Sequence, residues 1–445
     1  MASDLLAIAK SGARASRTAL DVTAQNIANA SSAGYVRRSV TMQEVSSSSR
    51  YSALGDVSFS GVRVSGVVRN ADLFRQAEVR RTGSDAARAN AEVRGLENIE
   101  SALEQTQVYQ SIVSFESSVQ QLLADPTDGS LRAATLEGAR TMANTFNIAS
   151  NALDTAGDGL RFEAQDGVEQ VNRISGELAR VNLRLSRAAD ASNDQSTLLD
   201  QRDTLLEQMS QYIDVSATIN ADKTATVTIG NPTGPALVSG GASASLSMAT
   251  APDGTVSFAL DGAAVTLSSG SIAGNGQVLT KLAETKTNLD AIAAEVISVV
   301  NTAQTAGVDL DGNAGQPIFS GSTAADIGIA LANGRGIATA PAGAGANSRD
   351  PGNLVALRTA LESSNPASEM DSLLFDVSSS VSGRKVTRDA LESIASTARV
   401  ALEAQSGVDL DEEAVNLVRF QQAFSANGRV MQVAQDLFDT LLGIR

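Results

Sequence analysis

Residues 410–444 have the sequence LDEEAVNLVRFQQAFSANGRVMQVAQDLFDTLLGI. Along this stretch, one set of side chains recurs at alternating steps of three and four: Leu417, Phe420, Phe424, Asn427, Met431, Ala434, Phe438 and Leu441. Such spacing is typical of the apolar seam of a coiled coil. A helix of this length would extend about 50 Å, and the carboxylates at 411–413 would stabilise its first turn. The stretch therefore predicts a long helix that packs against another helix.

The first 30 residues carry a matching pattern. Its members are Leu5, Ile8, Gly12, Ala15, Ala19, Val22, Asn26 and Asn29. Several of these side chains are small, so a partner helix could approach closely. All the prolines of the chain lie between Pro126 and Pro366, so none interrupts either end helix. We expect the two end helices to pair with each other, with the rest of the chain projecting from them.

A second apolar stripe on residues 410–444 indicates partners outside the chain. It consists of Val430, Val433, Leu437 and Ile444. A pair of helices encloses little core and would leave this stripe exposed, and exposed apolar stripes generally mark partner surfaces. We infer an oligomer whose terminal helices pack among those of neighbouring copies. Periodicity alone leaves one alternative open, a monomeric helical bundle capped by its own ends.

The region between the ends is mainly helical in pattern. Apolar residues recur at helical spacing in the stretches 73–123, 164–189, 197–213, 277–304 and 369–405. Between 215 and 267 the period changes to two, and Asp261-Gly262 in this region is a strong hairpin signal. Two stretches rich in Gly, Ala, Ser and Pro, 230–247 and 340–351, indicate loops.

These patterns predict a mainly α fold with a small inserted β domain. Residues 1–35 and 406–445 would form a terminal coiled-coil domain with paired helices. Residues 36–214 and 277–405 would form a mainly helical rod domain, and residues 215–276 a small β-rich outer domain.

The composition excludes several classes of function. The formal charge is −16, and no cluster of cations suited to phosphates is evident, so we do not expect nucleic acid binding. The chain has no cysteine and no histidine, which excludes disulfides, imidazole metal ligands and Ser-His-Asp catalysis. Aromatic residues make up only 3%, so the cores must consist of aliphatic side chains. An assembly of such acidic chains must overcome repulsion by apolar contacts or paired charges.

No motif predicts catalysis, a cofactor or a metal. Gly274-Asn-Gly276 and Gly334-Arg-Gly336 lack the third glycine of a phosphate loop, so we interpret both as turns. The sequence Asp309-Leu-Asp-Gly-Asn313 begins like a calcium loop, but Ala314 and Ser320 stand where glycine and glutamate are needed. We interpret it as a turn, with a weak surface ion site as the alternative. The chain is therefore not expected to be an enzyme.

The sequence predicts no contact with a membrane. No segment approaches the roughly 18 apolar residues that a span requires. Residues 1–10 have no basic start, no long apolar run and no cleavage site, so they do not predict a Sec signal peptide.

Residues 24–38, AQNIANASSAGYVRR, resemble the N-terminal signature shared by flagellar rod, hook and hook-associated proteins. The matching positions are Asn26, Asn29, Gly34, Tyr35 and Arg37. The common form of the signature has proline before the glycine. Here Ala33 takes that place, so the turn is less rigidly specified. Gly34 would let the chain reverse where the helix ends.

Two further motifs narrow the resemblance to the hook-associated protein 1 (FlgK) family. Residues 198–203, LLDQRD, are similar to the corresponding helix of that family. Residues 409–422, DLDEEAVNLVRFQQ, and 437–442, LFDTLL, are similar to its C-terminus. The chain is short for the family, so an outer domain present in larger members is expected to be reduced or missing.

The resemblance implies an extracellular structural subunit of the bacterial flagellum, assembled as a ring between hook and filament. It implies export through the flagellar type III apparatus without a cleaved signal, and terminal helices that line an inner tube. The implied partners are further copies of the chain, the hook protein, a second hook–filament junction protein (FlgL) and an export chaperone (FlgN-like). The implied interface residues are Leu5, Ile8, Val22, Asn26, Asn29, Gly34, Tyr35, Leu417, Phe420, Phe424, Met431, Phe438 and Leu441. Among these, the chaperone contact would fall on Phe420, Phe424, Met431, Phe438 and Leu441.

Two alternatives remain open at this point. Another axial subunit, a hook or distal rod protein, shares the N-terminal signature, but hook subunits are mainly β between their ends. The second alternative is a secreted enzyme or adhesin built on the scaffold of a flagellar axial protein. An adhesin would use residues 215–267, and a hydrolase would need a carboxylate pair that the sequence does not locate.

Overall fold

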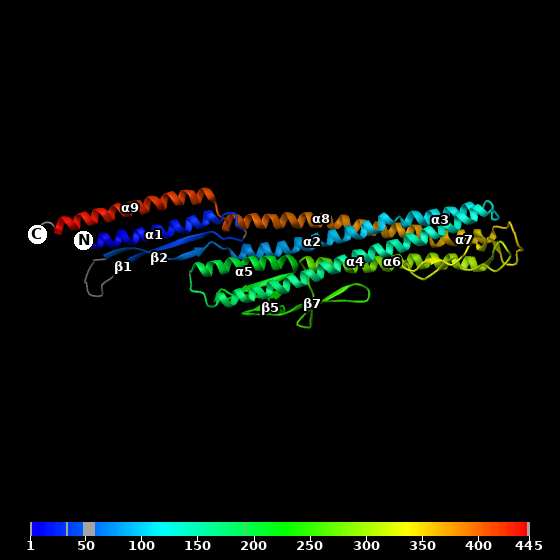
Figure 1. The fold of residues 1–445 in the computed structure, drawn as a ribbon, viewed down its shortest axis with the longest axis horizontal. Helices are drawn as coiled ribbons and strands as arrows, with labels where there is room; N and C mark the ends of the chain where they lie inside the picture. The colour runs from blue at the N-terminus through cyan, green and yellow to red at the C-terminus, as the bar shows by residue number, and fades with distance from the viewer. Residues whose placement is uncertain (1, 33, 48–57, 191, 443–445) are drawn as a thin grey trace. The chain divides into compact units, whose positions relative to one another are not determined.

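The computed structural model describes residues 2–32, 34–47, 58–190 and 192–442. Within these ranges the protein is mainly helical with small antiparallel sheets, as predicted (Figure 1). It divides into two compact units. Unit 1 comprises Met1–Ser84, Gln170–Ser245 and Glu392–Arg445, and unit 2 comprises Asp85–Glu169 and Leu246–Leu391.

Unit 1 contains the two terminal helices and a hairpin: α1 (Ala2–Asn29), β1 (Arg38–Ser47), β2 (Ser58–Arg69) and α9 (Leu410–Leu442). The helix α1 packs along α9 and also against the hairpin (Figure 1). At Gly12 the approach is close, because a Cβ atom there would lie 2.5 Å from Oδ1 of Asn427. The two terminal helices therefore pack together, as expected. That they form a coiled coil stays a prediction.

The β1–β2 hairpin corrects the expectation of a single β region at 215–267. The strands pair antiparallel, with shifts of register after Thr41 and after Glu44. Such irregularities insert a residue into one strand and break its period of two. In β2, Val62 and Val64 alternate with polar neighbours, but the period is lost further along the strand. The local signal for this hairpin is therefore weak.

Four further helical segments belong to unit 1. These are the first part of α2 (Leu73–Thr106), the last parts of α4 (Gly129–Leu185) and α8 (Pro366–Ser406), and all of α5 (Asn193–Tyr212). Ser192 caps α5, because its hydroxyl accepts a hydrogen bond from the Gln195 backbone N–H at 3.1 Å. The helix α4 begins well before the predicted start at 164.

A four-stranded sheet of order β3-β4-β5-β6 completes unit 1. Its strands are β3 (Val215–Ile219), β4 (Ala225–Ile229), β5 (Ala236–Ser239) and β6 (Ala242–Ser243). The last two lie in the stretch 230–247, which was wrongly expected to be only a loop. Gly240, at φ 56°, allows the tight turn between them. The buried amide of Asn182 in α4 bonds to the carbonyl oxygens of Ala225 and Gly240, both at 2.9 Å, and so fixes the sheet on the helix.

Unit 2 is built around α3 (Val108–Leu122), α6 (Ser271–Ala306) and α7 (Gly352–Ser364), together with the remaining parts of α2, α4 and α8. Its short strands are β7 (Leu246–Thr250), β8 (Val256–Leu260), β9 (Ala263–Val265), β10 (Gly307–Val308), β11 (Phe319–Ser320), β12 (Gly328–Ile329) and β13 (Ala340–Pro341). The predicted hairpin at Asp261-Gly262 is confirmed, with φ of 48° and 84° at these residues. The strands of 215–276 belong to both units, and the predicted division into three domains stays a prediction.

The core of unit 2 consists mainly of aliphatic side chains, as the low aromatic content predicts. Phe146 and Met142 are completely buried in it. The rings of Phe115 and Phe319 meet edge to face, with centroids 6.0 Å apart. This ring pair joins α3 to β11, two elements that are distant in sequence.

Two local expectations in unit 2 are wrong. Residues 274–276 lie inside α6 and not in a turn. A Cβ atom at Gly274 would lie 2.5 Å from the Arg88 carbonyl oxygen, so glycine here serves the close contact of α6 with α2. The stretch 73–123 is two helices, because Gln107 adopts the left-handed conformation, at φ 55°, between α2 and α3. Residues 334–336 form the short 3-10 helix η1 (Gly334–Gly336).

Candidate assembly interface

Both apolar stripes of α9 are largely open in unit 1. Phe424 and Phe438 are 43% and 52% exposed. Leu417, Phe420 and Met431 are half-buried. The exposed members of the second stripe are Val430, Val433 and Leu437. The side chain of Leu441 and residue Ile444 lie outside the described residues. The helix α9 therefore presents more apolar surface than α1 covers.

The predicted residues at the N-terminal end fall into two groups. Leu5 and Ile8 are exposed on α1, in the part of the helix farthest along the chain from the signature. Val22 and Asn26 are buried. Asn29 is half-buried, and its amide donates to the Gln25 carbonyl oxygen at 2.9 Å. The first group is exposed in unit 1, whereas the second makes contacts inside it.

Asn26 connects the end of α1 to the start of β1. Its amide N–H donates to the Arg38 carbonyl oxygen at 2.8 Å, and its Oδ1 accepts from the Arg38 backbone N–H at 3.0 Å. The hydroxyl of Tyr35 donates to the same Oδ1 at 2.9 Å. A buried side-chain amide thus satisfies both backbone groups of one residue, as a neighbouring strand would. No residue that lacks a donor or an acceptor at this position could do the same.

Gly34 and Tyr35 form the turn between these elements. Gly34 has φ 77°, and a Cβ atom there would lie 2.3 Å from Oγ1 of Thr204 in α5. Both observations require glycine at this position. The Arg38 guanidinium lies over the Tyr35 ring, 5.2 Å from its centroid. Burial raises the pKa of the Tyr35 hydroxyl, although Arg38 opposes the shift.

Arg37 joins the turn to the start of α9. Its Nε donates to Oε1 of Glu413 at 2.7 Å, and one terminal nitrogen donates to Oε1 of Glu412 at 2.8 Å. Its backbone N–H donates to the Ser406 carbonyl oxygen at 3.0 Å. Burial alone would lower the pKa of Arg37, but the two carboxylates outweigh it and raise the pKa. The signature segment is therefore bound directly to the acidic first turn of α9.

Asp200 of α5 forms ion pairs with two arginines. Arg38 donates to its Oδ2 at 3.0 Å, and Arg69 of β2 lies 2.7 Å from its Oδ1. Burial raises the pKa of the Asp200 carboxyl, even though both arginines favour the charged form. The desolvation of this carboxylate is therefore large, and the arginines only partly offset it.

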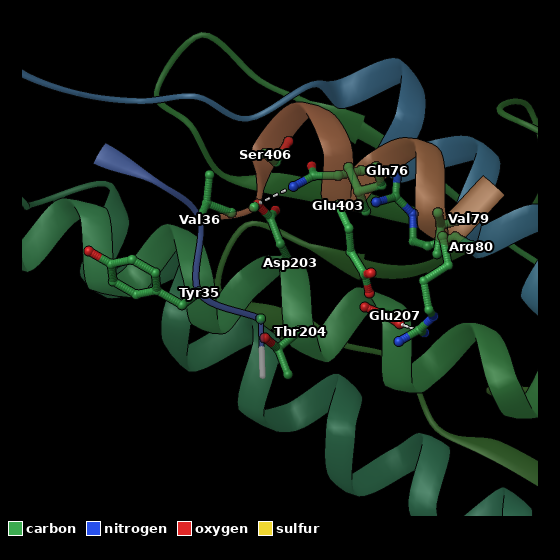
Figure 2. A pocket seen from close by; sticks show the side chains of 14 residues that line it. Tyr35, Val36, Gln76, Val79, Arg80, Asp203, Thr204, Glu207, Glu403 and Ser406 are labelled. Atoms are coloured by element: carbon green, nitrogen blue, oxygen red, sulfur yellow. Dashed lines mark hydrogen bonds and ion pairs between the residues drawn. The ribbon is translucent and has the colours of Figure 1, made fainter. Parts of the chain in front are cut away.

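Asp203, one turn along α5, is the more densely paired of the two aspartates. The partners of Asp203 are Arg202, Arg69 and Gln76, at 2.6, 3.0 and 3.1 Å. Figure 2 shows Gln76 of α2 pointing at Asp203, with Ser406 at the end of α8 beside them. We call this group of Arg37, Arg38, Arg69, Arg202, Asp200, Asp203, Glu412 and Glu413 the ionic cluster. The ionic cluster connects α5, α9 and the β1–β2 hairpin, and Gln76 links α2 to it through Asp203.

A small cavity of about 140 Å³ adjoins the ionic cluster, between α2, α5 and α8 (Figure 2). Ligand pockets usually hold about 300–1,000 Å³, so this space does not suit a cofactor. Among the residues that the structure describes, no group of three or more acidic side chains could hold a metal ion. The calcium-like loop is occupied internally, because Oδ1 of Asp309 accepts the backbone N–H groups of Asp311 and Asn313.

The family-model comparison decides the family. Residues 93–319, more than half of the chain, match the model described as the flagellar hook-associated protein FlgK helical domain. The chain belongs to the FlgK family. Residues 402–444 also match the C-terminal model of the flagellar basal body rod FlgEFG proteins. FlgK proteins are structural components of the flagellum, so the expectation of a flagellar structural protein is confirmed.

Curated relatives agree over their full length. Flagellar hook-associated protein 1 of Escherichia coli (strain K12) is 26% identical, with all of both chains aligned. The protein of the same name from Bacillus subtilis (strain 168) is 24% identical over 98% of this chain and 97% of its own length. The solved hook junction protein FlgK from Burkholderia pseudomallei is similar in fold, with a TM-score of 0.51 and 20% identity. That match covers 55% of this chain and 46% of the other.

The ionic cluster includes residues that sequence reasoning did not select. Arg69, Asp200 and Asp203 were not expected at any interface, and Arg38 was only quoted within the signature. The sequence did contain a signal for these ion pairs. The motif at 198–203 carries charged residues on a helix in which Leu198 and Leu206 are completely buried. Charged groups on a buried face need partners. Among the described residues, no helix is long and apolar enough to cross a bilayer.

Proposed function

We propose that this chain is the subunit that joins the flagellar hook to the filament, assembled as a ring through α1 and α9. The open apolar stripes of α9 carry the proposal. Together with the exposed Leu5 and Ile8 of α1, they leave apolar surface open in a FlgK-family chain whose relatives are named hook-associated and hook junction proteins. Burying each large apolar side chain would contribute about 1.5–3 kcal/mol. Several such contacts per copy can overcome the repulsion between chains of charge −16.

The ionic cluster gives this assembly a defined geometry. Arg37, Glu412 and Glu413 fix the start of α9 against the turn that follows α1. Each subunit would therefore offer its stripes at a constant angle to its neighbours. The terminal helices would line the inner tube, with the outer parts free to slide as the hook bends.

Four partners follow from this function. Further copies of the chain would complete the ring, the hook protein would lie below it, and a second junction protein (FlgL) above it. An export chaperone (FlgN-like) would cover the stripes of α9 before export through the type III apparatus without a cleaved signal. The proposed contact residues on α9 are Phe420, Phe424, Met431, Phe438 and Leu441.

Gold labelling of intact flagella sheared from the source cells tests the location. A single narrow band at the boundary of hook and filament is the expected result. Label along the hook or rod would instead favour a hook or distal rod subunit. The match of residues 402–444 to rod proteins makes that the second candidate.

Replacing Phe424 and Phe438 together with aspartate should abolish both chaperone binding and ring assembly. Two buried charges would replace two apolar contacts, and charges left unpaired in an interface are strongly unfavourable. Calorimetric titration with the chaperone and electron microscopy of complemented cells measure the two effects. The matched control is Gln422→Asp with Gln435→Asp, which adds the same charge at exposed polar positions of α9. Wild-type affinity of the Phe variant would refute the assigned contact.

A further inference from the structure

The small cavity beside the ionic cluster contains a buried arginine that has no counter-ion. Arg80 of α2 lines this cavity and is only 8% exposed. Among the described residues, no carboxylate or other acceptor lies within hydrogen-bond distance of its guanidinium. Burial lowers the pKa of Arg80, and the charges of Asp203 and Glu207 offset this effect only in part. A buried charge without a partner is unfavourable, so this guanidinium is suited to bind an anion.

The carboxylates in the cavity wall do not neutralise Arg80. Asp203 belongs to the ionic cluster, where two arginines already pair with it. Glu207 pairs with Arg399. Glu403 is exposed, so water screens its charge. All the residues that line the cavity belong to unit 1, and the positive charge of Arg80 is the one that they leave unpaired.

Two further polar atoms of the cavity wall have no partner among the described residues. They are Oε1 of Gln76 and Oγ of Ser406, and both are buried. The orientation of the Gln76 amide is fixed, because its Nε2 donates to the Asp203 carboxylate at 3.1 Å. Its Oε1 can therefore only accept a hydrogen bond. Figure 2 shows Gln76, Arg80 and Ser406 among the side chains around this space. A ligand that fits it must accept from the arginine and donate to the amide oxygen.

We propose that this cavity binds one inorganic phosphate ion that carries a proton. The Arg80 guanidinium would donate to two of its oxygens, as such planar forks do with phosphates. The protonated oxygen would donate to Oε1 of Gln76, and the Ser406 hydroxyl would donate to the remaining oxygen. Sulfate and carboxylates have no proton to donate at neutral pH, so they would leave the Gln76 oxygen unpaired.

The size of the cavity agrees with this ligand. The four oxygens of phosphate take the place of about four waters, or about 120 Å³ at ~30 Å³ for each water. The cavity holds about 140 Å³. The site suits one free ion, and it does not alter the expectation that the chain binds no nucleic acid.

A bound phosphate would connect α2 to the last residue of α8. Gln76 and Arg80 lie on α2, and Ser406 ends α8. The carbonyl oxygen of Ser406 accepts from the Arg37 backbone N–H at 3.0 Å, so the ion would bind directly beside the ionic cluster. A ligand that binds only the folded state stabilises it. This inference goes beyond the proposed junction role and does not depend on it.

Equilibrium dialysis of the full chain against radiolabelled inorganic phosphate, at constant ionic strength, tests the proposal. The wild type should bind one phosphate for each chain. Arg80→Met should weaken binding about tenfold or more, and Ser406→Ala about threefold or more, because each removes a donor. The control Arg81→Met changes the adjacent, exposed arginine and should keep wild-type affinity. Sulfate should compete about tenfold less well than phosphate.

Three results of this experiment would overturn the proposal. Absence of saturable binding to the wild type would show that water fills the cavity. Equal affinity of Arg80→Met and Arg81→Met would show that phosphate binds elsewhere. Equal competition by sulfate and phosphate would show that no proton is donated to Gln76.

Thermal unfolding separates a ligand-binding role of Arg80 from a structural one. In phosphate-free buffer, Arg80→Met should melt at or above the wild-type temperature, because it removes a buried charge that has no partner. Added phosphate should raise the melting temperature of the wild type and leave that of Arg80→Met unchanged. A lower melting temperature of the variant without phosphate would show that Arg80 itself holds unit 1 together, and would refute the proposed site. Gold labelling tests the junction role separately.

Discussion

The variant Asp203→Asn is expected to destabilise unit 1 by about 3–5 kcal/mol, the usual cost of removing one member of a buried ion pair. Asp203 is buried and receives Arg69, Arg202 and Gln76. Asparagine preserves the size of the side chain but removes its charge. Two buried guanidinium groups would then lose a counter-ion, and the amide nitrogen would face donors.

Hydrogen exchange measured by mass spectrometry resolves this effect by region. Peptides from α5 and from the first part of α2 should lose protection, whereas peptides from α3 in unit 2 should keep it. The control is Asp371→Asn, the same change at an exposed position of α8. Equal protection of α5 in the variant and the control would mean that the ionic cluster does not hold unit 1 together.

The ionic cluster also illustrates what the sequence could not predict. Arg38 and Asp200 are 162 positions apart, and no periodic pattern relates positions so distant. The family signature and the motif at 198–203 were each recognised, yet nothing in either motif indicated that they touch. Residues chosen for an interface with other chains, such as Asn26, serve a contact within the chain. Side-chain hydrogen bonds of this kind depend on the folded chain and not on its local spacing.

Elements with a regular local signal were predicted well. The helices α1 and α9 follow unbroken steps of three and four, and the β8–β9 turn follows from the backbone preferences of Asp261-Gly262. Elements whose periodic pattern is interrupted by a bulge or a helix break were not predicted correctly. The register shifts of β1–β2 hide its period, and Gln107 divides a continuous apolar pattern into two helices. At Gly274 the tertiary contact with Arg88, and not a turn, determines the residue.

The variant Arg132→Met is expected to destabilise unit 2 by about 3 kcal/mol or more, because buried acceptors that lose a charged donor remain unpaired. Arg132 is 1% exposed at the start of α4, and burial lowers the pKa of its guanidinium. Its Nε donates to the Pro126 carbonyl oxygen at 2.6 Å, and its terminal nitrogens donate to Ile337 and Thr339, at 2.8 and 2.7 Å. One planar group thus connects the loop before α4 with the segment after η1.

Arg132→Lys should recover little of this loss, since a single ammonium group cannot reach acceptors on both sides as a planar fork does. The matched control is Arg140→Met on the same helix, where the arginine is exposed and forms a surface ion pair with Glu137. That change should cost below about 1 kcal/mol, as expected for a surface ion pair. Amide exchange at residues 334–341 is the measurement, because their carbonyl groups would lose the donor. If Arg132→Met and Arg140→Met leave these amides equally protected, the guanidinium does not hold the segment, and the apolar core of unit 2 holds it instead.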